Sequence, residues 1–262
     1  MSAPVEKNNA LDSAVVRVRG LHKAFGKKTV LDGVDLDIPR GASTVIIGGS
    51  GTGKSVLLKH IIGLMKPDAG TVHVDGVAIN RLDNREITRF RRKFGMAFQE
   101  GALFDSMTVE QNVAFPLVRQ GEMSRKMVRQ RVAECLAEVG LSDAGKKMPA
   151  ELSGGMRRRV GFARAVANQP EILLFDEPTT GLDPVTKGTI DDLIVELKEN
   201  LSSTTVTITH DMESVFRIAD WVGMLHEGRI IVWSSPGELR TLTDPRLRAF
   251  ISRGHPQDSS SA

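Results

Sequence analysis

The stretch GGSGTGKS at residues 48–55 constrains the fold of this chain more than any other feature. It fits the pattern G-x-x-x-x-G-K-[ST], whose glycines let successive backbone N–H groups turn inward around phosphate oxygens. The apolar run STVIIGG (43–49) precedes it, and KSVLLKHIIGLM (54–65) follows with apolar residues at helical spacing. A buried strand, a glycine loop and an amphipathic helix in this order predict a phosphate-binding loop in an α/β fold. A chance glycine-rich turn would lack this context.

The segment ILLFDEP (172–178) supplies the second chemical element. Its apolar residues predict an interior strand, so Asp176 would emerge at the carboxyl end, where α/β sheets bind ligands. Asp176 suits a metal ion, and Glu177 suits a general base for an attacking water. An acidic loop start after a core strand is the plain alternative, which the glycine loop makes less credible.

Alternating patterns predict further strands. VVRVRG and VDLDI (34–38) read as half-buried antiparallel strands, and Asp75-Gly76 marks a hairpin inside TVHVDGVAI. EILLF (171–175) and TTVTIT (204–209) read as buried strands. We therefore expect these parts: a flexible tail at 1–14; an α/β core with a β subdomain at 15–95 and 166–234; a helical subdomain at 96–165; and an extension of one or two short helices at 235–262 with a disordered end.

Composition narrows the class of protein. The formal net charge is +3, which gives little support to nucleic-acid binding, and we expect no nucleic-acid partner. A single cysteine, Cys135, fits a reducing compartment. Residues 1–14 do not resemble a signal peptide, and no apolar run approaches the ~20 residues that span a bilayer. If membranes matter, a partner supplies the spanning helices.

The order of motifs resembles the ATP-binding subunits of ABC transporters. The glycine loop is followed by Gln99, LSGG (152–155), Asp176-Glu177, Asp183 and His210, so the resemblance covers residues 15–235. It implies an α/β P-loop NTPase core with an antiparallel β subdomain and a helical subdomain. It also implies ATP hydrolysis with ATP and Mg²⁺ bound between the two chains of a homodimer.

The resemblance assigns roles at each matching position. Phe25 would stack on adenine, although a core phenylalanine is the alternative. Ser153, Gly154 and Gly155 would cover the nucleotide held by the partner subunit, and Asp183 would communicate across the dimer. The implied catalytic residues are Glu177, His210, Gln99 and Lys54; the metal-binding residues Ser55, Gln99 and Asp176; and the other nucleotide-binding residues Gly48, Gly49, Ser50, Gly51, Thr52, Gly53, Lys54, Ser55 and Val56.

Met156 occupies the position where the family usually has glutamine. The Ser153 hydroxyl, the backbone N–H groups of Gly154 and Gly155 and the helix dipole would hold the phosphate without that side chain. The missing glutamine hydrogen bond would cost about 0.5–1.5 kcal/mol, so we expect an active ATPase. Together with FQEGALFDSMTVEQNVAFPL (98–117), Met156 resembles the ATPases of MCE-type lipid transport systems such as the bacterial Mla system. The alternative is that 101–117 only caps the helical insert and that Met156 fills a gap.

This second resemblance implies phospholipid transport between bacterial envelope membranes. Implied partners are an integral membrane permease, an MCE-domain substrate-binding protein and a small STAS-domain protein, at the cytoplasmic face of the inner membrane. Competing hypotheses are another ABC transporter ATPase, for amino acids, lipoprotein release or cell division, and a soluble ABC ATPase outside transport.

Several side chains have a plain expectation. The basic clusters at 89–93 and 157–159 read as solvated helix faces, with contact to a coupling helix or to phosphates as the alternative. Met123, Met127 and Leu136 read as core residues. The block 235–253 either strengthens the dimer or forms a docked tail.

Overall fold

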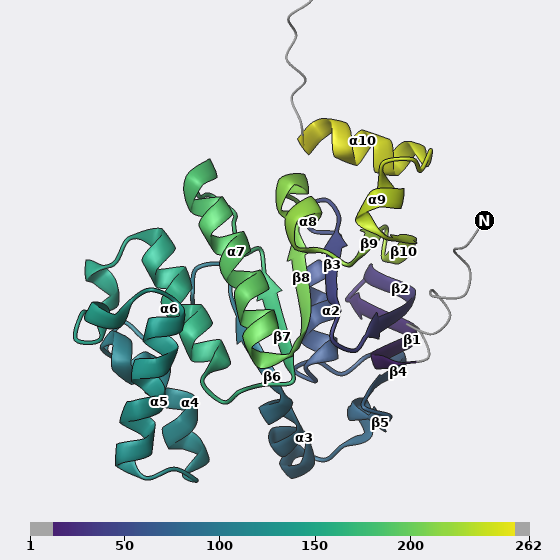
Figure 1. Ribbon diagram of the computed structural model, residues 1–262. Helices are drawn as coiled ribbons and strands as arrows, with labels where there is room; N and C mark the ends of the chain where they lie inside the picture. The colour runs from purple at the N-terminus through teal and green to yellow at the C-terminus, as the bar shows by residue number, and fades with distance from the viewer. Residues whose placement is uncertain (1–12, 255–262) are drawn as a thin grey trace, which may run out of the picture. The chain divides into compact units, whose positions relative to one another are not determined.

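The computed structural model describes residues 13–254, and the chain divides into two compact units. The first unit contains the chain up to Asp83 together with the part from Ile208 onward, and the second contains Asn84–Thr207. Figure 1 labels the elements of both units. The expected flexible tail, apart from its last two residues, and the expected disordered end lie outside the described residues.

The first unit begins with antiparallel strands. β1 (Ala14–Phe25) pairs with β2 (Lys28–Pro39) and with β4 (Ala69–Val74), and β4 turns into β5 (Val77–Ala78). This gives a four-stranded sheet in the order β2-β1-β4-β5. The predicted hairpin is confirmed, because Asp75 and Gly76 both adopt positive φ at the turn.

The same unit carries the element that precedes the glycine loop. All five residues of β3 (Ser43–Ile47) are buried, as the apolar run predicts. β3 pairs in parallel with β9 (Trp221–His226), which pairs antiparallel with β10 (Arg229–Ser234). The remaining elements of this unit are α2 (Lys54–Ile61), a 3-10 turn η1 (Ile79–Arg81), α8 (Met212–Ile218), α9 (Pro236–Leu239) and α10 (Pro245–Gly254). The last two are the short helices expected after residue 235.

The second unit combines parallel strands with a group of helices. β6 (Phe94–Ala97) pairs in parallel with β7 (Ile172–Asp176), and β8 (Thr204–Thr209), which begins in this unit, lies next to β7. The helices are α3 (Asn84–Phe90), α4 (Val109–Gln120), α5 (Arg125–Glu138), α6 (Gly154–Val166) and α7 (Pro184–Leu201), with 3-10 turns η2 (Arg91–Lys93), η3 (Ser142–Ala144) and η4 (Pro149–Glu151).

Helices α4, α5 and α6 pack on one another, as Figure 1 shows in teal. The packing of α5 against α6 is stabilised by hydrogen bonds from a charged side chain to the end of a helix. The buried Arg131 of α5 donates to the carbonyls of Val166 and Ala167 at the end of α6, at 3.0 and 3.2 Å. The last turn of a helix leaves such carbonyls without a partner inside the helix, and Arg131 bonds to two of them, so it fastens the carboxyl end of α6 to α5.

Two side-chain expectations are corrected. Met123 and Met127 are not core residues: they are 37% and 51% exposed, on α5 and the turn before it, whereas Leu136 is buried. Their apolar character suggested burial, but Met127 lies on the exposed side of the first turn of α5, and Met123 lies in the turn before that helix. Within the described residues no helix is both long and apolar enough to cross a membrane.

Candidate functional site

The glycine loop leaves β3 at Gly48 and enters α2 at Lys54. Gly48 has φ +155°, and a Cβ there would lie 2.5 Å from the carbonyl oxygen of Leu225. Gly53 caps α2 with φ +105°, and a Cβ there would lie 3.0 Å from the carbonyl oxygen of Val30. Only glycine satisfies both the backbone conformation and the space, so the sequence pattern has a direct steric cause.

The loop is closed by its own polar groups. The Thr52 hydroxyl donates to the Gly49 carbonyl at 2.9 Å, and Lys54 Nζ donates to the carbonyls of Gly48 and Gly49 at 2.7 and 3.1 Å. The Lys54 side chain is buried although it is a cation. The ammonium group is therefore held at the loop beside the amino end of α2, an arrangement suited to an anionic phosphate chain.

Phe25 is the last residue of β1 and is 48% exposed, which excludes the alternative of a core phenylalanine. The Lys23 ammonium lies 5.7 Å from the ring centroid and is fixed by Asp68 at 2.7 Å. An exposed aromatic face in the same unit as the phosphate loop can stack on a planar base. The adenine-stacking role of Phe25 stays a prediction.

His210 directly follows β8 and is exposed. The next residue, Asp211, caps α8: its Oδ1 accepts from the amides of Glu213 and Ser214 at 3.0 and 3.4 Å. The Asp211 amide in turn donates to the Thr209 hydroxyl at 3.0 Å. His210 therefore lies between a buried strand and a firmly capped helix, which limits the freedom of its backbone.

In the second unit, Asp176 is the last residue of β7 and is half-buried. Glu177 follows with φ +49°, an unusual conformation for a residue with a side chain. Its Oε2 accepts a hydrogen bond from the Thr180 hydroxyl at 3.0 Å. Local strain of this kind persists where the surrounding structure enforces it and is concentrated at functional sites.

The signature segment forms the amino end of α6. Ser153 is the cap, and its hydroxyl accepts from the Met156 amide at 3.3 Å. The contact uses the backbone of Met156 and not its side chain. Gly154 and Gly155 are the first helical residues, and a Cβ on Gly155 would lie 3.0 Å from Thr186 Cγ2.

Asp183 caps α7, and its carboxylate accepts from the Thr186 amide at 3.0 Å and the Thr186 hydroxyl at 2.6 Å. These hydrogen bonds, the hydroxyl first, hold the pKa of Asp183 below its ordinary value. A hollow of about 430 Å³ is lined jointly by the signature residues and by the segment around Asp183. Within this unit, therefore, the structure brings two of the predicted nucleotide-contacting motifs to one concave surface.

Gln99 lies in an exposed loop after β6 that is bound to α6 through its backbone. Arg158 Nε donates to the Gln99 carbonyl at 2.6 Å, and Arg164 donates to the carbonyls of Gly101 and Ala102 at 2.6 and 2.8 Å. Arg158 is buried, so the expectation of a solvated face is wrong at this position. The helical period could have shown this, because residues 158, 161, 162 and 165 share one face of α6 and the other three are small or apolar.

The segment after Gln99 shapes a second hollow, of about 340 Å³. Phe104, Phe115 and Arg164 line it, with the Phe104 and Phe115 rings 4.8 Å apart and the Arg164 guanidinium 6.0 Å from the Phe104 centroid. The fully buried Asn112 fixes its rim: its Oδ1 accepts from the Phe104 amide at 2.8 Å, and its Nδ2 donates to three backbone carbonyls of residues 104–108. The result is an apolar hollow with one cation on its wall.

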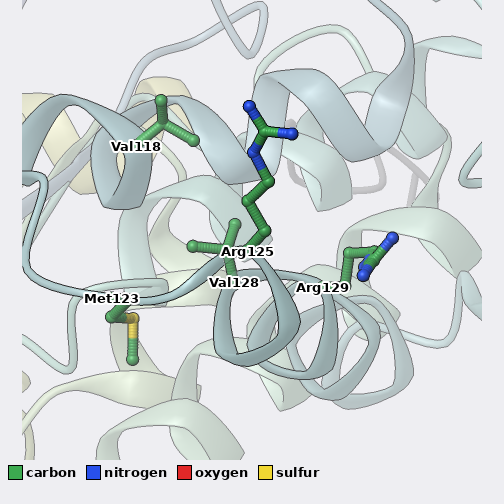
Figure 2. A pocket seen from close by; sticks show the side chains of 5 residues that line it. All are labelled: Val118, Met123, Arg125, Val128 and Arg129. Carbon is green, nitrogen blue, oxygen red and sulfur yellow. The ribbon is translucent and has the colours of Figure 1, made fainter.

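A third hollow, of about 320 Å³, lies at the α4–α5 turn (Figure 2). Figure 2 shows the five side chains that line it, which combine an apolar floor with two arginines: Val118, Met123, Arg125, Val128 and Arg129. None of them belongs to the predicted nucleotide site.

An α/β fold with this phosphate loop defines a P-loop nucleotide-binding protein. Residues 31–180 match the ABC transporter family. The chain therefore belongs to the ABC transporter family, as an ATPase subunit. The α/β P-loop fold expected from the sequence is confirmed.

Curated relatives cover nearly the whole chain. The intermembrane phospholipid transport ATP-binding protein MlaF of Haemophilus influenzae is 39% identical over 92% of this chain and 91% of its own length. The probable ribonucleotide transport protein mkl of Mycobacterium leprae is 40% identical over 90% of this chain and 68% of its own. The methionine import protein MetN of Carboxydothermus hydrogenoformans is 48% identical over 88% of this chain and 66% of its own.

Solved structures show the same fold. A dimeric ATP-binding cassette in a post-hydrolysis state with ADP and Pi has a TM-score of 0.77 and 34% identity, covering 84% of this chain and 98% of that one. The cbiO1 protein of Clostridium perfringens has a TM-score of 0.80 and 30% identity, covering 94% of this chain and 97% of that one.

Proposed function

We propose that this chain is the ATPase subunit of a transporter that moves phospholipid between bacterial envelope membranes. The chain would work as a homodimer that drives a membrane permease. The observation that carries the proposal is the apolar hollow lined by Phe104, Phe115 and Arg164, built from the segment that resembles MCE-type transport ATPases. The similarity to MlaF over nine tenths of both chains supports the same cargo.

In the proposed reaction, Glu177 accepts the proton of the attacking water while Lys54, Gln99 and His210 stabilise charge on the transferring phosphoryl group. The groups assigned to Mg²⁺ are a hydroxyl, a carboxylate and an amide oxygen, from Ser55, Asp176 and Gln99. Hard oxygen donors of this kind fit that ion, which neutralises phosphate charge when bound. The hollow shared by the signature and Asp183 would receive the nucleotide of the partner subunit.

Glu177→Gln tests the base assignment. The amide keeps the size of the side chain but cannot accept the proton, so the variant should bind ATP, stall in a closed dimer and show no turnover. Dimer formation with ATP is measured by size-exclusion chromatography, and turnover by phosphate release. Normal turnover would remove Glu177 from the mechanism.

The proposed membrane partners are a permease, an MCE-domain substrate-binding protein and a small STAS-domain protein. The permease would dock in the hollow lined by Phe104, Phe115 and Arg164. An apolar floor beside a cation suits an amphipathic segment of a permease that carries an acidic residue. The chain would then act at the cytoplasmic face of the inner membrane, held there by the permease.

Purification from the native membrane tests the cargo. We expect a permease, an MCE-domain chain and phospholipid to co-purify with the full-length protein. Phe104→Asp, which places a charge in the hollow, should lose the permease and keep ATP binding. Val118→Asp is the matched control and should keep the permease. Val118 is 65% exposed on α4 and lines the hollow at the α4–α5 turn, not the one at Phe104.

Amino-acid import is the second candidate, favoured by the 48% identity to MetN. The same purification separates the two functions. An amino-acid permease without an MCE-domain chain or lipid would overturn the phospholipid assignment and leave the ATPase intact.

A further inference from the structure

Arg158 occupies an unusual place for a charged residue. It lies on the buried face of α6 with only 8% of its surface exposed, and its burial lowers the pKa of the guanidinium. Its neighbours on the helix differ: Arg157 is exposed, and Arg159 donates to the Val139 carbonyl at 3.2 Å. A buried guanidinium is retained against a desolvation cost, so its contacts are the feature to explain.

The contacts of Arg158 join two segments that the sequence links to catalysis. Nε donates to the Gln99 carbonyl at 2.6 Å, and Nη2 donates to the Thr180 carbonyl. Nη1 is buried and has no hydrogen-bond partner among residues 13–254. One side chain of the signature helix therefore fixes the backbone of the Gln99 loop and of the loop after β7.

The second of these contacts leads to the proposed general base. Thr180, whose carbonyl accepts from Arg158, donates its hydroxyl to Glu177 Oε2 at 3.0 Å. Glu177 itself has φ +49°, so its carboxylate is directed by a backbone that needs external support. The order of contacts is Gln99, Arg158, Thr180 and Glu177, all within the second unit.

We propose that Arg158 is a positioning residue for hydrolysis, which sets the Gln99 loop and, through the Thr180 hydroxyl, the Glu177 carboxylate in one fixed relation to the signature helix. This inference rests on the proposed role of Glu177 as general base. Arg158 and Thr180 do not contact the reacting atoms in this scheme; they hold the groups that do. A movement of the Gln99 loop would therefore change the position of the Glu177 carboxylate through the hydrogen bonds of Arg158 and Thr180.

The position of Thr180 allows a clean test, because its hydrogen bond to the Glu177 carboxylate uses the hydroxyl, whereas its other bond to Glu177 joins backbone atoms and is kept in every variant. Thr180→Val keeps the branched shape and removes the donor, whereas Thr180→Ser keeps the donor. In the full-length protein, we expect Thr180→Val to lower kcat about tenfold with KM for ATP within about twofold. Thr180→Ser should restore kcat to within about threefold of the parent.

Variants of Arg158 test the contacts that this side chain makes with the Gln99 loop and with Thr180. Arg158→Ala should lower kcat at least tenfold while ATP affinity changes little, and Arg158→Lys, which can keep one donor, should fall between it and the parent. Arg157→Ala on the same helix is the control, with kcat expected to be unchanged. If Arg158→Ala does not fold, the two Thr180 variants decide the question alone.

The outcomes separate this inference from the function beneath it. Turnover by Glu177→Gln would overturn the base assignment. An inactive Glu177→Gln together with a Thr180→Val variant whose kcat stays within twofold of the parent would overturn the positioning role. A kcat loss in Thr180→Val that Thr180→Ser does not rescue would show that packing, and not the hydroxyl, is responsible.

Discussion

Replacing Gly161 with alanine tests how closely α6 approaches the Gln99 loop. Gly161 lies in the interior of α6, and a Cβ built there would be 2.9 Å from Gly101 Cα and 3.2 Å from the Gly101 carbonyl oxygen. An ordinary contact is 3.4–4 Å. The loop would therefore have to move by about half an ångström, against the bonds that hold it to Arg164.

Two effects of opposite sign decide the stability of this variant. Alanine in place of glycine favours a helix by about 0.8–1.0 kcal/mol. Overpacking at a rigid contact costs about 1–3 kcal/mol, so the net loss is about 1 kcal/mol and Tm should fall by about 2–4 °C. The displaced loop carries Gln99, and a shift of this size should lower kcat about tenfold.

Thermal unfolding and phosphate release at saturating ATP measure both quantities. Gly237→Ala in α9 is the matched control, because a Cβ there meets nothing within 4 Å. That variant should raise Tm slightly through the lower entropy of the unfolded chain and leave kcat unchanged. If Gly161→Ala raised Tm as Gly237→Ala does, and kept full activity, the close approach of α6 to the loop would be refuted.

Three further predictions concern the nucleotide loop, the signature and the cysteine. Gly48→Ala should weaken ATP binding more than tenfold in an equilibrium binding assay, because its Cβ would overlap the Leu225 carbonyl. Met156→Gln should change kcat by less than about tenfold, since the helix cap uses the Met156 backbone; a hundredfold change would contradict this. Burial raises the pKa of Cys135 from 9.0 to about 12, so the folded thiol should resist alkylation at pH 8. Between about pH 9 and pH 12 only the unfolded thiol ionises, so the free energy of unfolding should fall by about 1.4 kcal/mol per pH unit. Denaturant titrations at several pH values measure this fall, and the Cys135→Ala variant should lack the part of the pH dependence that comes from the thiol.

Local patterns predicted the elements of the fold well. The run 43–49, the hairpin at Asp75-Gly76 and the buried strands at 171–175 and 204–209 all appear in the structure close to their expected places. These elements are dictated by short-range sterics and by burial of contiguous apolar residues, which are visible in a window of a few residues. The helix after the glycine loop is shorter than the pattern suggested, because α2 ends at Ile61, two residues before Gly63.

The supporting contacts of the site could not be predicted in the same way. Arg158 and Thr180 are 22 residues apart, and their meeting depends on how α6 packs beside β7. The four hydrogen bonds of Asn112 likewise depend on the path of the loop before α4. Residues that would contact the nucleotide lie in recognisable motifs, whereas the residues that hold these motifs in place are specified by tertiary packing.

The positive φ of Glu177 has a consequence for protein engineering. Glycine adopts this conformation without steric strain, so Glu177→Gly should give a more heat-resistant protein, and one that is inactive under the proposed role of Glu177 as general base. A screen that selects variants for thermal endurance alone would therefore tend to enrich for loss of the carboxylate. Under the proposed mechanism, selection at this position has to include turnover, because thermal stability favours glycine at residue 177 and hydrolysis requires glutamate.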